Sequence, residues 1–125
     1  LNNQDWNVFL ENRKQGNYQI SRNGWIADYN DPLTFLEIFK SDNGNNNCHW
    51  KNAEFDALID QAKAEADSAK RFLILHQAED LWAEEMPGAP IYYYADTYLK
   101  KPNLEGYWDS PLGYKFFMYC TKTAE

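Results

Sequence analysis

The chain has 125 residues, of which 44% are hydrophobic and 25% are charged, a balance that excludes wholesale disorder and allows one domain with a packed core. Acidic residues number 19 against 12 basic residues, and the resulting net charge of −7 argues against nucleic acid or an anionic membrane surface as a partner. Aromatic residues make up 17% of the chain, and such rings serve cores, interfaces and ligand clefts alike.

The first third of the chain predicts two short helices with a strand between them. Residues 5–15 place their apolar side chains at helical spacing, and Gly16 is a typical helix stop. Residues 18–23 alternate with the period of two that a strand requires. The second helix is expected to begin at Asp31 and Pro32, with the aspartate as its cap and the proline at its first position.

Two longer amphipathic helices follow an Asn-rich loop over residues 41–52. Asn52 is the expected cap of the first helix, and Asp67 or Ser68 caps the second, which Pro87 ends. The faces expected to pack in the core consist of Phe55, Leu58, Ile59 and Ala62 in the first helix and of Phe72, Leu75, Ala78 and Trp82 in the second.

The last third of the chain predicts strands. Residues 89–95 are rich in Tyr, and residues 97–100 and 114–121 have similar β propensity. Helices followed by strands give a mixed α/β fold, in which the helices cover a small sheet.

Motifs of common enzymes are missing from the sequence. There is no Gly-x-Ser-x-Gly elbow, no Gly-x-Gly-x-x-Gly loop and no His-Glu-x-x-His helix. His49 and His76 are the only histidines, and the adjacent pair Cys48-His49 does not by itself place two ligands on one metal. Cys48 and Cys120 allow one disulfide at most, or two free thiols. We therefore expect no enzyme, no catalytic residue, no metal and no cofactor.

The segment from Arg22 to Pro32 is the most informative for binding. Asp28 is expected to leave a strand end beside Trp25, so that Asp28 could pair with an ammonium group, Arg22 with a carboxylate, and Trp25 with the chain between them. Alternatively, Asp28 and Arg22 pair with one another and Trp25 belongs to the core. The residues alone favour this second arrangement.

A family resemblance favours the first arrangement, in which these residues bind a ligand. The segments and residues that carry it are 1–6, Phe9-Leu10, Gln15-Gly16, Gly24-Trp25-Ile-Ala-Asp28-Tyr29-Asn-Asp-Pro32, Phe35-Leu36, Asn46, Trp50, Phe55-Asp56, Ala62, Arg71, Ala78-Glu79, Pro90-Ile91-Tyr92-Tyr93-Tyr94, Lys101-Pro102 and Gly106. With these segments, nearly the whole chain resembles the peptide-binding class of extracytoplasmic solute-binding proteins of ABC importers, the oligopeptide- and dipeptide-binding proteins.

The resemblance implies a fold and a place in it. It implies the C-terminal part of a two-lobed periplasmic-binding-protein (type II) fold, with helices packed on a small mixed sheet. Residues 1–90 would then form part of the second lobe. Residues 91–125 would form a Tyr-rich crossover strand and a C-terminal segment that return towards the first lobe. Most of the first lobe would lie outside this sequence, so self-association of the isolated segment is also expected.

The resemblance also implies roles for single residues. Asp28 inherits the contact with the peptide's N-terminal ammonium group, Arg22 inherits a contact with a ligand carboxylate, and Trp25 and Tyr94 line the cleft. Asn46 is a looser member of this ligand-binding set. The sequence departs from some relatives at Ile26, where they carry a cysteine.

The implied partners are a peptide ligand and the transmembrane permease subunits of an ABC importer. The implied location is extracytoplasmic, either in the periplasm or as a cell-surface lipoprotein of a Gram-positive organism. On the same scaffold, related subfamilies bind nickel complexes, haem or sugars. Two alternatives of other classes remain: a glycan-binding or glycan-active domain that uses its surface aromatic residues, and a dimerising fragment without a ligand.

Overall fold

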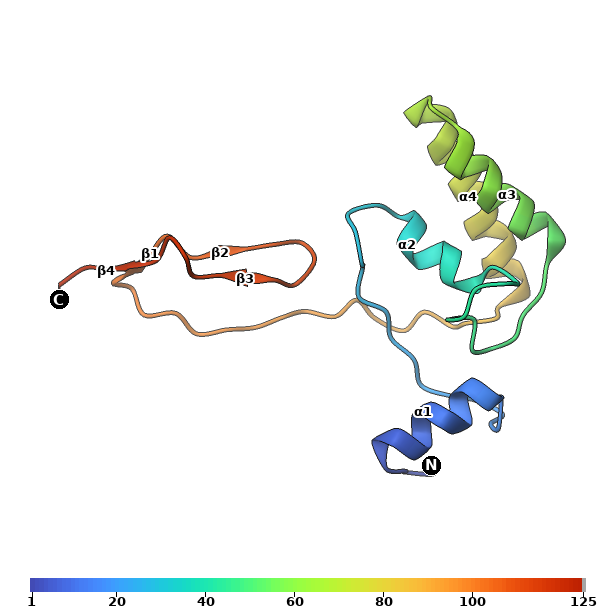
Figure 1. Ribbon diagram of the computed structural model, residues 1–125, viewed down its shortest axis with the longest axis horizontal. Coiled ribbons are helices and arrows are strands. Elements are labelled where there is room, and N and C mark those ends of the chain that lie inside the picture. The colour runs from blue at the N-terminus through green and yellow to red at the C-terminus, as the bar shows by residue number, and fades with distance from the viewer. Residues whose placement is uncertain (125) are drawn as a thin grey trace. The chain divides into compact units, whose positions relative to one another are not determined.

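The computed structural model describes residues 1–124, which form helices in the first part of the chain and short strands in the last (Figure 1). The elements are α1 (Trp6–Gln15), α2 (Leu33–Leu36), the 3-10 turn η1 (Glu37–Phe39), α3 (Ala53–Ala64), α4 (Ser68–Glu85), β1 (Leu104–Glu105), β2 (Trp108–Asp109), β3 (Lys115–Phe116) and β4 (Thr121–Lys122). The chain divides into two compact units. The helical unit comprises Leu1–Trp25 and Asp31–Ala89, and the strand unit comprises Ile26–Asn30 and the residues from Pro90 onward.

Capping side chains define where the predicted helices begin. The Asp5 carboxylate accepts a hydrogen bond from the backbone N–H of Asn7, which starts α1. The Asn52 side chain accepts from two N–H groups of α3, and the Asp67 side chain accepts from two of α4. Helix α1 ends at Gly16, whose φ of 74° suits glycine. The structure thus confirms these helices and settles the start of α4 on Asp67.

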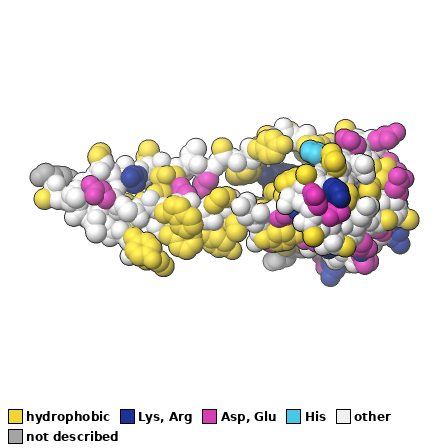
Figure 2. All heavy atoms as spheres, turned by 90° about the horizontal axis from the view of Figure 1, so that it is seen from above, with side chains coloured by type: hydrophobic (Ala, Val, Ile, Leu, Met, Phe, Trp, Pro, Cys, Tyr) yellow, Lys and Arg dark blue, Asp and Glu magenta, His cyan; other side chains and the backbone are white. Residues whose placement is uncertain are grey.

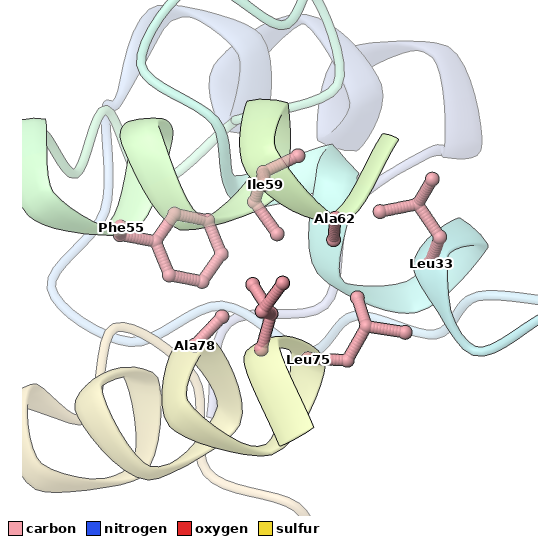
Figure 3. Close-up of a cluster of buried hydrophobic side chains, with 7 residues drawn as sticks. Leu33, Phe55, Ile59, Ala62, Leu75 and Ala78 are labelled. Atoms are coloured by element: carbon pink, nitrogen blue, oxygen red, sulfur yellow. The ribbon is translucent and has the colours of Figure 1, made fainter. Parts of the chain in front are cut away.

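The core of the helical unit lies between α3 and α4. Phe55, Ile59 and Ala62 of α3 point toward Leu75 and Ala78 of α4, and Leu33 of α2 closes one end of the cluster (Figure 3). The residues predicted for α3 are therefore buried, apart from Leu58, which is partly buried and packs against the same cluster.

One core prediction for α4 is wrong. Phe72 is 46% exposed, whereas Ile74, which the sequence did not single out, is buried. Arg71 explains the difference, because its Nε donates to the carbonyl of Ala62 in α3 at 3.1 Å and so faces that helix. Phe72 follows by one residue and is rotated by about 100° around the helix axis, away from α3.

The predicted strands are the main correction. Residues 18–23, 89–95 and 97–100 form no ladder with any described part of the chain. A strand needs a neighbour that takes its N–H and C=O groups, and alternation along one segment does not supply that neighbour. The predicted strand over 114–121 contains only β3 and the first residue of β4.

The strand unit contains two antiparallel ladders, β1 with β4 and β2 with β3. They keep the chain in the α/β class but are only two residues long. Gly106 follows β1 with a φ of 75°, and a Cβ atom there would lie 2.1 Å from the carbonyl oxygen of Tyr119. Glycine is therefore required for the close approach of the two chain segments.

Candidate functional site

The residues of the predicted ligand site fall in both units. Arg22, Trp25 and Asn46 belong to the helical unit, and Asp28 and Tyr94 belong to the strand unit. Arg22, Asp28 and Tyr94 are exposed, and Trp25 is half-buried. Tyr94 is 80% exposed and its ring lies 5.7 Å from that of Tyr92. The structure therefore leaves Arg22, Asp28 and Tyr94 open to solvent.

Trp25 is anchored to the helical unit through its indole nitrogen. Its Nε1–H donates to the hydroxyl of Thr34 in α2 over 3.4 Å, a long and therefore weak hydrogen bond. Thr34 is buried, so the contact holds one edge of the ring against α2. The polar edge of the indole is thus hydrogen-bonded, and the apolar part of the ring is available for packing.

Asp31 forms the strongest polar contact near the site. Its two carboxylate oxygens accept hydrogen bonds from the two terminal nitrogens of Arg71, both at 2.8 Å. The same carboxylate accepts from the backbone N–H of Leu33 at 2.8 Å. Helix α2 begins one residue later than predicted, with Pro32 in the cap position, but Asp31 still satisfies an N–H group of its first turn.

Charge and hydrogen bonding fix the ionised state of Asp31. The hydrogen bonds from Arg71 lower the pKa of Asp31 below its ordinary value, and burial opposes this only in part. The side chains of Asp31 and Arg71 are 28% and 21% exposed. The pair is thus charged and partly shielded from water at neutral pH.

Sequence reasoning missed this pair as a feature of the site. It assigned Asp31 to a helix cap and Arg71 to the family resemblance, 40 residues further along the chain. Only the packing of α4 beside α2 and α3 brings the two together. An Arg in the first turn of a helix, on the side that packs against another helix, is the one signal in the sequence that could have indicated a buried partner.

Asn46 uses its side chain within its own loop. It is 7% exposed, and its amide donates to the carbonyls of Phe39, Lys40 and Trp50, the last at 2.7 Å. Its oxygen accepts from the thiol of Cys48. These bonds hold the turn before α3, and a contact of Asn46 with a ligand stays a prediction.

A cavity of about 370 Å³ lies elsewhere in the helical unit. It is lined by Gly16, Tyr18, Gln19, Cys48, His49, Trp50 and Pro87. Tyr18 donates from its hydroxyl to the carbonyl of Asn47 at 2.7 Å, and burial raises its pKa. None of the predicted ligand residues lines this cavity.

Residues 1–124 contain no group of three or more His, Cys, Asp or Glu side chains placed to hold a metal ion. Both cysteines are free thiols. No helix in the described chain is long and apolar enough to cross a membrane.

The chain is similar to known binding proteins. No protein-family model matches the chain. The oligopeptide-binding protein OppA of Bacillus subtilis is 46% identical over 107 residues, which are 85% of this chain and 20% of that protein. The dipeptide-binding protein DppE of the same organism is 44% identical over 114 residues, 91% of this chain and 21% of that protein. The chain thus spans about one fifth of the length of these relatives.

Solved structures show a similarity to the same kind of protein. The substrate-binding domain of an oligopeptide ABC transporter from Bacillus anthracis superposes with a TM-score of 0.83 at 28% identity, and the match covers 98% of this chain and 24% of that one. The chain is therefore related to the peptide-type solute-binding proteins of ABC importers and has the fold of part of a type II periplasmic binding protein. The resemblance seen in the sequence is confirmed.

The relatives also bear on the other predictions. Those named here are binding proteins rather than enzymes, as expected, and none is a glycan-binding or glycan-active protein. A further relative of 40% identity, from Escherichia coli, is a probable deoxycholate-binding periplasmic protein. Proteins similar to this chain therefore have names that denote different ligands.

Proposed function

We propose that the chain is the C-terminal part of the solute-binding component of an ABC importer, and that the whole protein captures oligopeptides or dipeptides. The observation that carries this proposal is the 46% identity with an oligopeptide-binding protein over 85% of the chain. In this proposal residues 1–90 contribute to the second lobe, and residues 91–125 return towards the first.

Binding would rest on groups that all peptides share. Asp28 pairs with the N-terminal ammonium group, and Arg22 pairs with a ligand carboxylate. Trp25 and Tyr94 form apolar walls of the cleft. The exposure of Arg22, Asp28 and Tyr94 supports these roles, as does the anchoring of Trp25 through Thr34. Contacts with termini and backbone give affinity without a sequence preference, and closure of two lobes over the ligand removes water that would weaken the charge pairs.

Asp28 favours a ligand that has an amine. A bile acid such as deoxycholate carries a carboxylate and no ammonium group, so Asp28 would repel it rather than bind it. The acidic side chain at this position therefore supports a peptide over the ligand of the E. coli relative.

The location and partners follow from the same proposal. Several relatives are periplasmic by name, which supports an extracytoplasmic protein. The protein would be either periplasmic or a cell-surface lipoprotein of a Gram-positive organism. The transmembrane permease would be its membrane partner, and the isolated segment would self-associate.

Calorimetry tests the proposal directly. The full-length protein is unfolded to remove bound ligand, refolded, and titrated with an unmodified tripeptide and, separately, with deoxycholate. We expect saturable binding of the tripeptide and no binding of deoxycholate. Binding of deoxycholate alone would overturn the peptide assignment, and so would the absence of binding to peptides of two to five residues.

A further inference from the structure

The two residues that flank the loop carrying Asp28 are each bonded within the helical unit. Residues 26–30 follow Trp25, whose indole is bonded to Thr34, and precede Asp31, whose carboxylate is bonded to Arg71. Asp28 is three residues from each anchor, so the chain keeps its Cα within about 11 Å of both. Any change at an anchor therefore changes the set of positions that Asp28 can reach.

Of the two anchors, the pair Asp31–Arg71 is the stronger. A carboxylate and a guanidinium that share two parallel hydrogen bonds fix orientation as well as distance. Arg71 itself is held by its third donor, Nε, on the carbonyl of Ala62. The guanidinium thus joins the first turn of α4 and the last turn of α3 to the residue that ends the loop.

Helix capping does not account for this arrangement. One oxygen of Asp31 is enough for the N–H of Leu33, and an Asn would serve equally well. Other ion pairs of the helical unit, such as Lys40–Asp60 at 3.0 Å, involve one oxygen each, and their carboxylates do not adjoin the loop. The second oxygen of Asp31 and the fork of Arg71 fix residue 31 on the α3–α4 pair.

We propose that Asp31 and Arg71 are positioning residues for the ligand site, which hold the 26–30 loop so that Asp28 is in place before the ligand arrives. This inference rests on the proposed function, because Asp28 is its ligand contact. A loop that is ordered in advance does not lose backbone entropy on binding. Releasing the anchor should therefore weaken binding by about tenfold or more.

Two conservative variants of the full-length protein remove the clamp but keep its surroundings. Asp31→Asn keeps the acceptor for the N–H of Leu33 and loses the charge pair. Arg71→Lys keeps the charge and loses the fork. Asp60→Asn is the matched control, because it breaks an ion pair of the helical unit far from the loop in sequence. Ile59→Val lowers stability from the core and shows what a loss of stability alone does to binding.

Hydrogen exchange measures how firmly the 26–30 loop is held, and calorimetry separately measures the affinity for the tripeptide. We expect faster amide exchange in residues 26–30 of the ligand-free Asp31→Asn and Arg71→Lys proteins, and tripeptide affinity about tenfold lower than in Asp60→Asn and Ile59→Val. Unchanged exchange in this loop overturns the inference whatever the affinities are. Faster exchange with unchanged affinity also overturns it but leaves the proposed function intact. If the unsubstituted protein binds no peptide, the proposed function fails instead.

Discussion

A single carboxylate, that of Asp31, serves a helix start and an ion pair together. It accepts from Leu33 at the start of α2 and from both terminal nitrogens of Arg71. The first role is local and could be predicted from the Asp-Pro pattern, because capping needs only neighbours in sequence. The second depends on α4, so it could not.

The lowered pKa of Asp31 predicts a pH dependence of stability. A carboxyl group whose folded pKa lies below its unfolded value stabilises the fold above the unfolded pKa, and this contribution is lost as the pH falls through the folded pKa. The stabilising contribution of Asp31 should be complete at any pH above its ordinary pKa of 3.8. It should be lost as the pH falls below that value and through the lower folded pKa. Urea denaturation should show Asp31→Asn to be less stable by about 1–2 kcal/mol at pH 7. The two proteins should converge in stronger acid, and a difference that is the same at both pH values would contradict this account.

Helices α3 and α4 show what local pattern can predict. Their caps, their lengths and most of their core faces follow from residues close together in sequence. The alternation at 18–23 and the β propensity at 89–95 predicted strands, but neither segment has a partner among the described residues. A ladder joins distant segments, so its existence cannot be predicted from one segment alone.

The cap of α3 can be tested by substitution. Asn52 accepts from the N–H groups of Glu54 and Phe55, and its amide donates to Glu85 at 2.7 Å. Asn52→Ala should lower the free energy of unfolding by about 1 kcal/mol or more, and Asn52→Ser should recover the capping share. Gln77→Ala, on the exposed side of α4, should change it by less than about 0.5 kcal/mol. Equal effects of Asn52→Ala and Gln77→Ala in chemical denaturation would refute the assignment of the cap.

A pair of phenylalanines tests the corrected core. Phe55 of α3 is fully buried, whereas Phe72 of α4 is 46% exposed. Phe55→Ala should cost about 3–5 kcal/mol, because it removes buried apolar surface and leaves a cavity. Phe72→Ala should cost well under half of that. Thermal denaturation followed by circular dichroism measures both losses of stability. A larger loss for Phe72→Ala than for Phe55→Ala would show that Phe72 belongs to the core face of α4, as the sequence predicted.

The two units of the molecule differ in how much they bury. The helical unit has a continuous core, whereas the strand unit has no buried residue among those described. Many of its hydrophobic side chains lie at the surface instead (Figure 2). They include Ile91, Tyr92, Tyr93, Tyr94, Leu99 and Phe117. A unit without a core gains little from the hydrophobic effect, so its order should depend on further contacts.

Limited proteolysis of the isolated 125-residue chain tests this contrast. Chymotrypsin cleaves beside aromatic residues, which both units contain. We expect early cleavage in the Tyr-rich segment 91–99 and late cleavage at Phe55, since backbone that is not held in packed structure is cut first. In the full-length protein the Tyr-rich segment should be protected as well. Cleavage of both sites at similar rates in the isolated chain would contradict a stable helical unit.

In the proposed site, Asp28 would bind the N-terminal ammonium group of a peptide. The most direct test is calorimetry of the full-length protein with a tripeptide and its N-acetylated form, repeated with Asp28→Asn and with Asp42→Asn as an exposed control. In the unsubstituted protein and in the control, acetylation should weaken binding by about 2–4 kcal/mol, roughly 30- to 700-fold. In Asp28→Asn the two peptides should bind almost equally. An acetylation effect of the same size with and without Asp28 would contradict the account.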